Sequence, residues 1–124
     1  MVFGIGIDMI EVDRVAEKVA KEDFKTRVFT EGEIAYCELN FNDPQKYAAR
    51  FAAKEAFFKA LGTGWMGQFT FKDVEVVNDE MGKPGIKLHG AVKDWVSEKG
   101  IQNIFLSLSH IKTMAGAVVV LETK

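Results

Sequence analysis

Apolar and polar residues alternate along parts of this 124-residue chain and recur at helical spacing along others. The segment Val2–Ile7 alternates large apolar residues with glycine, which predicts a buried strand that Asp8 ends. The segment Glu11–Lys21 places its valines and an alanine at helical spacing and predicts an amphipathic helix. The chain is therefore expected to begin with a strand and a helix.

Two further helices are predicted from their start signals. Thr30 and Glu33 match a capping box, so a helix is expected over residues 31–39. Asp43 followed by proline joins an N-cap acceptor to a residue that favours the first helical position. The segment Pro44–Leu61, rich in Ala, Lys, Arg and Glu, then predicts the longest helix of the chain, and the glycine after it is a stop signal.

The second half of the chain is rich in predicted strands. The pattern predicts strands over Phe69–Asn78, Gly85–His89, Ile104–Ser109 and Ala115–Glu122, and a helix over Ala91–Lys99. The sequence 79–84 (DEMGKP) reads as a turn. One strand, several helices and then a strand-rich half with one inserted helix predict an α+β fold. The length predicts a single domain over residues 1–124.

Composition narrows the classes of protein that fit. The apolar fraction of 48% and the charged fraction of 27% are ordinary for a globular domain. A net charge of −2 argues against nucleic-acid binding. The apolar run Met114–Leu121 is far shorter than the roughly 20 residues that a membrane span needs. No signal peptide is visible, and the single cysteine, Cys37, cannot form an internal disulfide, so a cytoplasmic location is predicted.

Three charged residues stand where chemistry is possible. Asp8, at the end of a buried strand, is either a turn acceptor or a ligand for a hard cation. Glu55 and Lys59 share one face of the long helix, because residues four apart are neighbours on a helix. They form either an exposed pair or, since alanines flank Glu55, part of a face that a backbone or a ligand approaches closely.

Two more segments carry groups that bind anions in other proteins. Gly62-Thr63-Gly64 is either a helix C-cap or a loop whose backbone N–H groups meet a phosphate. Ser107 and Ser109 share one face of a strand, and His110 follows at its end. His110 is either a turn histidine or a contact for an anionic ligand. A hydrolase is disfavoured because no G-x-S-x-G elbow surrounds either serine.

Positive charge gathers between residues 14 and 27. Five basic residues (Arg14, Lys18, Lys21, Lys25 and Arg27) outnumber three acidic ones there. This segment is either a solvated face or a docking stripe for an acidic partner, which would act mainly on association rate and specificity.

Five motifs occur in a fixed order: GIGID at 4–8, FTEGE at 29–33, RFAAKEAFFKALGTG at 50–64, GKP at 82–84 and SLSH at 107–110. Together they resemble the holo-acyl-carrier-protein synthase family, the short branch of the 4′-phosphopantetheinyl transferases, over nearly the whole chain. The resemblance implies the fold of those transferases, with a long central helix packed on a small, mainly antiparallel sheet. It also implies a homotrimer with active sites between subunits.

The resemblance further implies roles for individual residues. Asp8 and Glu55 match the family's magnesium ligands and, with Lys59, its catalytic residues. The positions that match coenzyme A contacts are Arg50, Lys59, Gly62, Thr63, Gly64, Lys83, Pro84, Ser109 and His110, some of them from a neighbouring subunit. Arg14 matches a residue that docks the acidic carrier protein, and the charge pattern adds Lys21 and Arg27. Larger superfamily members carry a third acid where this chain has Ile10, so the general base stays open.

The implied reaction moves 4′-phosphopantetheine from coenzyme A to a serine of apo acyl carrier protein, releasing adenosine 3′,5′-bisphosphate, in a magnesium-dependent step of fatty acid biosynthesis. Two alternatives come from other classes. One is a non-catalytic module that binds coenzyme A or the carrier protein. The other is a hot-dog thioesterase, which needs one long helix wrapped by a regular antiparallel sheet.

Overall fold

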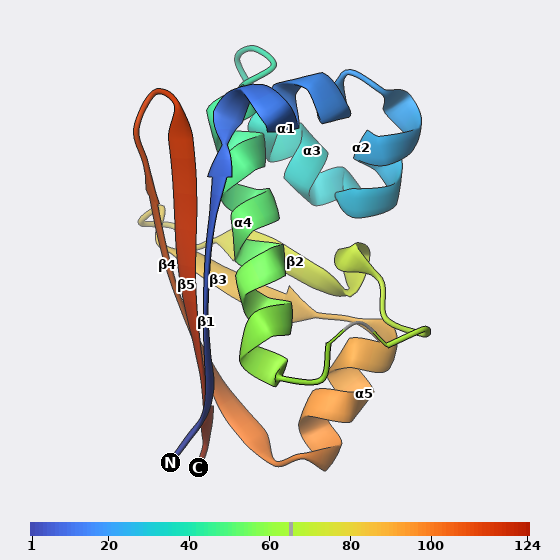
Figure 1. Ribbon diagram of the computed structural model, residues 1–124, viewed down its shortest axis with the longest axis vertical. Coiled ribbons are helices and arrows are strands. Elements are labelled where there is room, and N and C mark those ends of the chain that lie inside the picture. The colour runs from blue at the N-terminus through green and yellow to red at the C-terminus, as the bar shows by residue number, and fades with distance from the viewer. Residues whose placement is uncertain (65) are drawn as a thin grey trace.

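The computed structural model describes residues 1–64 and 66–124. A single strand comes first, four helices follow, and a strand-rich half with one more helix completes the chain (Figure 1). In chain order the elements are β1 (Val2–Glu11), α1 (Val12–Val19), α2 (Glu22–Val28), α3 (Glu31–Cys37), α4 (Pro44–Leu61), the 3-10 turn η1 (Phe71–Asp73), β2 (Val74–Asn78), β3 (Pro84–Leu88), α5 (Gly90–Glu98), β4 (Ile101–His110) and β5 (Met114–Thr123). The predicted α+β class is confirmed.

Two small antiparallel sheets flank the long helix α4. The larger has the strand order β1-β5-β4, and β2 pairs with β3 in the smaller one. Figure 1 shows the larger sheet as one layer beside α4, with α1, α2 and α3 at one end of the molecule and α5 at the other. The two termini meet at that second end, where the Met1 amino group lies 2.9 Å from the carbonyl oxygen of Thr123. Helix α4 thus forms the centre about which the other elements pack.

Helix α4 begins and ends at the predicted signals. The Asp43 carboxylate accepts a hydrogen bond from the Gln45 amide at 3.0 Å, and Pro44 follows the cap. Gly62 closes the helix in the left-handed conformation at φ 75°. Most of its side chains are buried, including those of Phe51 and Phe58, which lie two turns apart. The helix is therefore held by packing on several sides.

Strand β1 lies directly against the backbone of α4. A Cβ added to Gly4 would lie 1.9 Å from the Ala60 carbonyl oxygen, and one added to Gly6 would lie 1.9 Å from that of Ala56. Only a residue without a side chain fits at such an approach. The small residues on both elements are thus explained by contact between strand and helix backbone.

Three sequence expectations are corrected. Asp8 does not end the first strand, because β1 continues to Glu11 and keeps its alternation, with Asp8 and Ile10 turned toward the core side. The predicted strand Phe69–Asn78 begins only at Val74. Before it, Thr70 and Asp73 form a capping box around η1, which a strand pattern does not reveal. A separate helix, α2, follows the first helix.

Candidate active site

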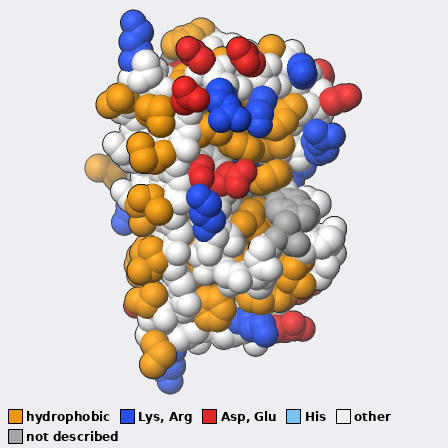
Figure 2. Space-filling model, in the orientation of Figure 1, with side chains coloured by type: hydrophobic (Ala, Val, Ile, Leu, Met, Phe, Trp, Pro, Cys, Tyr) orange, Lys and Arg blue, Asp and Glu red, His pale blue; other side chains and the backbone are white. Residues whose placement is uncertain are grey.

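A groove of about 730 Å³ opens between β1, α1 and α4. Asp8 from β1 lines it together with Glu55 and Lys59 from α4. Figure 2 shows acidic and basic side chains gathered near the middle of this face of the molecule. The structure therefore brings together the three residues that were predicted to be catalytic, although Asp8 is far from the other two in sequence.

The packing of β1 on α4 explains why Asp8 reaches Glu55. Gly4 lies at the level of Ala60, and Gly6 lies at the level of Ala56, one turn earlier in the helix. Since alternate strand residues point to the same face, Asp8 continues this series toward the start of the helix. Its inward side chain therefore arrives beside the turn that carries Glu55.

Lys59 links the strand to the helix. Its Nζ lies 2.9 Å from Asp8 Oδ1 and donates a second hydrogen bond to the Ile7 carbonyl oxygen at 3.1 Å. The Lys59 side chain is 54% exposed and that of Asp8 is 16% exposed. The ammonium group is thus held at the groove but stays open to solvent, where it can meet a charged ligand.

Glu55 lies in a less favourable environment for its charge. Burial raises the pKa of the Glu55 carboxyl above its ordinary value, and the nearby Asp8 carboxylate raises it further. The charges of Lys59 and Lys18 oppose this shift. Asp8 and Glu55 are therefore close enough to repel each other, and a cation between them would relieve that repulsion.

Replacing Glu55 with glutamine is expected to stabilise the fold, because the neutral amide removes a charge that burial penalises. The gain at neutral pH should appear as a melting temperature above that of the wild type. It should shrink as the pH falls toward about 5, because the raised pKa lets the folded wild type take up a proton before the unfolded chain does. Thermal melts of both proteins across this range test it, and a less stable variant at neutral pH contradicts it.

The donor set of the groove suits a hard divalent ion. Mg²⁺ commonly takes one or two carboxylates and completes its coordination with waters and substrate phosphates. Asp8 and Glu55 supply two carboxylates that face one groove and feel each other's charge. Over residues 1–64 and 66–124 no group of three or more His, Cys, Asp or Glu side chains could hold a metal. An ion bound by these two carboxylates would complete its coordination with oxygens of water or of a substrate.

The predicted docking residues lie on a continuous surface. Arg14 and Lys18 line the groove from α1. Lys18 also borders a second hollow, which Lys21 and Arg27 line as well. Lys18 lies over the ring of Phe24 at 5.6 Å, which keeps its charge near this surface. The strip from Arg14 to Arg27 leads away from the groove along α1 and α2.

Arg50 and the turn before β3 form a second cluster. Arg50 is buried, with 3% of its surface exposed. Its guanidinium donates a hydrogen bond to Asn78 Oδ1 at 2.5 Å and lies 4.0 Å from the centre of the Tyr36 ring. The Asn78 amide donates to the Gly82 carbonyl oxygen at 3.1 Å, beside Lys83. The Arg50 Nε is buried without a hydrogen-bond partner among the described residues. Arg50 and the turn are thus brought together by Asn78, but they do not line the groove.

The remaining predicted contacts lie apart from the groove within one chain. Gly62 and Gly64 both have positive φ, at 75° and 69°, and a Cβ at either position would meet no atom within 4 Å. The Thr63 hydroxyl donates to the Gly64 carbonyl oxygen between them. Ser109 and His110 line a different hollow, of about 360 Å³, on the outer face of the larger sheet. Asp8 borders that hollow as well as the groove, so the two meet at this residue.

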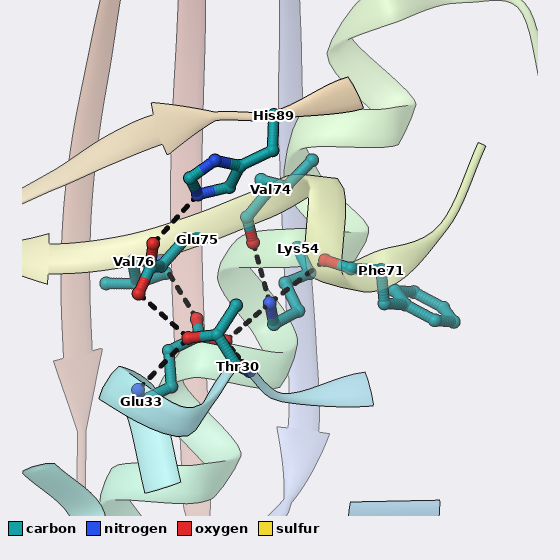
Figure 3. Close-up of polar contacts among 8 residues, drawn as sticks. All are labelled: Thr30, Glu33, Lys54, Phe71, Val74, Glu75, Val76 and His89. Atoms are coloured by element: carbon teal, nitrogen blue, oxygen red, sulfur yellow. Dashed lines mark hydrogen bonds and ion pairs between the residues drawn. The ribbon is translucent and has the colours of Figure 1, made fainter. Parts of the chain in front are cut away.

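One buried polar cluster was missed by sequence reasoning. Lys54, adjacent to Glu55, is fully buried and lies 2.8 Å from Glu33 (Figure 3). Thr30 connects this pair to Glu75, whose carboxylate also lies 2.8 Å from His89 Nε2. The capping box at residue 30 signalled the helix start, but nothing local showed that its glutamate also pairs with a buried lysine.

Similarity to known proteins shows the family to which the chain belongs. Residues 4–115 match the model of the 4′-phosphopantetheinyl transferase superfamily. The chain belongs to this superfamily. A holo-(acyl-carrier-protein) synthase of Solibacter usitatus is 44% identical over 124 residues, covering 98% of this chain and 99% of the relative. That of Halothermothrix orenii is 46% identical over 122 residues, covering 97% of each chain.

Solved structures of this transferase family share the fold. The holo-(acyl-carrier-protein) synthase of Neisseria meningitidis has a TM-score of 0.89 and 35% identity, covering 98% of this chain and 99% of its own. That of Bacillus anthracis, solved in complex with CoA (3′,5′-ADP), has a TM-score of 0.82 and 37% identity, covering 100% and 99%. The predicted transferase fold is confirmed, and the hot-dog alternative is wrong. Among the described residues, no helix is long and apolar enough to cross a membrane.

Proposed function

We propose that this chain transfers the 4′-phosphopantetheine group of coenzyme A to a serine of apo acyl carrier protein in the groove between β1 and α4. The observation that carries the assignment is the meeting of Asp8 and Glu55 in one groove, with Lys59 held beside them. Membership of the transferase superfamily supplies the reaction class. A protein that only binds coenzyme A has no need of two carboxylates that destabilise each other.

The acidic and the basic residues of the groove have different roles in the proposed reaction. Asp8 and Glu55 would hold Mg²⁺, which would supply charge neutralisation at the pyrophosphate of coenzyme A. Lys59 presents its exposed ammonium to the phosphate oxygen that becomes the leaving group. The bond between the carrier serine oxygen and phosphorus forms as the bond to adenosine 3′,5′-bisphosphate breaks. The serine proton would pass to a water molecule held in the groove or, through that water, to Glu55.

The other predicted contacts receive the nucleotide end of coenzyme A. The Gly62-Thr63-Gly64 loop is exposed, and although the Gly62 amide donates to the Lys59 carbonyl oxygen, a phosphate can approach the N–H groups of Thr63 and Gly64. Arg50 lies beside the turn that carries Lys83 and Pro84, and together they offer positive charge at one place. Ser109 faces the outer side of the sheet, and His110 borders the same hollow at the end of β4, so we infer that they serve the site of a neighbouring subunit.

The outer face of the larger sheet supports a homotrimer. Ile5, Ile7 and Met9 on β1 are 64%, 60% and 66% exposed, and Phe105 on β4 is 52% exposed. Figure 2 shows hydrophobic side chains in a row along the edge where this sheet lies. Contiguous exposed apolar surface of this kind is typical of protein interfaces. Because the hollow with Ser109 and His110 opens on the same face and borders Asp8, a copy packed there would complete the site.

Ile5→Asp is expected to convert the trimer into monomers, since a charge in an apolar interface loses its hydration without gaining a partner. Sedimentation velocity measures the change directly. Transfer activity should fall with it, because each site would lose the residues supplied by its neighbour. The control is Val77→Asp on β2, at a residue that is 37% exposed away from this face. A wild type that sediments as a monomer contradicts the assignment.

The basic strip on α1 and α2 is the proposed docking surface for the acidic carrier protein. Arg14→Glu should raise the KM for carrier protein by roughly tenfold, because reversed charge slows encounter and repels an acidic partner. The KM for coenzyme A should change by less than about twofold, and the effect on carrier should weaken as salt increases. Steady-state kinetics with each substrate varied in turn test this. Equal changes in both constants would count against a docking role.

One experiment tests the proposed reaction as a whole. Apo acyl carrier protein is incubated with this protein, coenzyme A and Mg²⁺, and the carrier is weighed by intact-mass spectrometry. A gain of one phosphopantetheine group per carrier supports transfer, and chelation followed by restored Mg²⁺ tests the metal requirement. Coenzyme A binding without any mass gain would instead support the non-catalytic module.

The single, buried Cys37 fits a reducing compartment, and we place the reaction in the cytoplasm.

A further inference from the structure

Lys54 is a buried charge whose donors are all engaged. Its side chain is 0% exposed, and its Nζ lies 2.8 Å from Glu33 Oε1, 3.0 Å from the Phe71 carbonyl oxygen and 2.6 Å from the Val74 carbonyl oxygen. Figure 3 shows these acceptors arranged around the ammonium group. An ammonium has three N–H donors, so this set uses each of them.

The three acceptors belong to different parts of the fold. Glu33 lies in α3 and is fixed there, because its carboxylate also accepts from the Thr30 amide at 2.9 Å and from the Val76 amide at 2.8 Å. The two carbonyl oxygens belong to Phe71 and Val74, at the two ends of η1. One buried ammonium therefore ties α4 to α3 on one side and to η1 on the other.

The attachment to η1 closes a loop that begins at the end of α4. The chain leaves the helix after Leu61 and comes back to it at η1, which begins at Phe71. There the carbonyl oxygens bind to Lys54, which lies almost two turns before the helix end. The far end of the phosphate-binding loop of the proposed function is thus held by the Lys54 ammonium, acting with the rings of Phe69 and Phe71, which pack on α4.

We propose that Lys54 is a positioning residue for coenzyme A binding, which it serves by fastening η1 to α4 and so setting the position of residues 62–64 and 66–70. The inference rests on the proposed function, because it assumes that the loop with Gly62 and Gly64 receives a phosphate of coenzyme A. Lys54 itself does not touch the substrate, since it is buried and its three donors are in use. Its effect reaches the ligand through the loop.

A matched pair of variants separates positioning from stability. Glu33→Gln removes the charge of the partner but keeps the Lys54 bonds to the two carbonyl oxygens. Lys54→Met with Glu33→Gln removes those bonds as well and leaves no unpaired buried charge, so this double variant should fold even where Lys54→Met alone does not. Circular dichroism and thermal melts establish that each protein is folded at the assay temperature.

The kinetic prediction compares these two variants. The double variant should raise the KM for coenzyme A by roughly tenfold or more over that of Glu33→Gln, because small misplacements of binding groups weaken contact with the ligand. Glu33→Gln should lose stability, because the buried Lys54 ammonium keeps no charged partner, but where it is folded its KM for coenzyme A should stay within about twofold of the wild type, because both carbonyl bonds remain. The KM for carrier protein should change by less than about twofold in both. A role limited to folding would move both substrates, or neither, in any folded variant.

Hydrogen–deuterium exchange of the free protein supplies a readout that does not involve activity. Amides of residues 66–73 should exchange faster in the double variant than in Glu33→Gln, with little difference in β5, because η1 has lost its hydrogen bonds to Lys54, although the ring packing of Phe69 and Phe71 on α4 remains. Equal exchange in the two variants would overturn the inference. So would faster exchange with an unchanged KM for coenzyme A.

A third variant distinguishes failure of this inference from failure of the proposed function. Gly64→Val strains the loop itself, because Gly64 has a φ of 69°, which valine rarely adopts. If Gly64→Val raises the KM for coenzyme A and the double variant does not, the role of Lys54 is refuted while the loop assignment stands. If neither variant raises the KM for coenzyme A, the loop is not the coenzyme A site. The role of Lys54 and the loop assignment of the proposed function are then both refuted.

Discussion

Replacing Asp8 or Glu55 with alanine is expected to lower the rate of phosphopantetheine transfer by roughly a thousandfold or more while the protein stays folded. Each change removes one of the two carboxylates that face the groove and would hold the divalent ion. The fold should persist, because Lys59 is 54% exposed and can be hydrated when Asp8 is lost. Intact-mass assay of the carrier against time gives the rate.

The control for this prediction is Glu98→Ala, which removes an exposed acid from α5, on the far side of the fold from the groove. Its rate should equal that of the wild type. Titration with Mn²⁺, followed by its paramagnetic resonance, should show weakened metal binding in the Asp8 and Glu55 variants but not in the control. Transfer by either variant at the wild-type rate in Mg²⁺ would refute the assignment of both carboxylates.

Local signals predicted the helices well because each signal is satisfied by nearby atoms. The capping box of Thr30 and Glu33 is present, and both of its hydrogen bonds join residues three apart. The same holds for Asp43 at the start of α4, which caps the amide two residues later. Where the stabilising partner is local, a short stretch of sequence contains the whole interaction.

Tertiary contacts set the limits of prediction. Asp8 seemed to end a strand, because a carboxylate rarely fits inside a buried one, but it lies at a groove where Lys59 meets it from 51 residues away. Lys54 reads as a solvent-exposed helix residue until the carbonyl oxygens of residues 71 and 74 are placed around it. The residue types of the candidate site could be proposed from motifs, but their convergence depended on how β1 packs on α4.

That packing yields a second prediction of large effect. Gly6→Ala should destabilise the protein by roughly 3 kcal/mol or more, a large part of the stability of an ordinary domain. The added Cβ would lie 1.9 Å from the Ala56 carbonyl oxygen, closer than real Cβ contacts allow, so β1 would have to move away from α4 by about 1 Å or more. Urea unfolding of variant and wild type measures the loss.

The same displacement of β1 should also lower the rate of phosphopantetheine transfer. Asp8 follows Gly6 on the same face of β1, so a strand pushed off the helix carries its carboxylate away from Glu55, and transfer should fall even in the folded fraction. Gly85→Ala in β3 is the matched control, because a Cβ there meets no atom within 4 Å and should alter stability by less than about 0.5 kcal/mol. If Gly6→Ala were as stable and active as this control, β1 could not lie against α4 as the structure places it, and the groove would lose its physical basis.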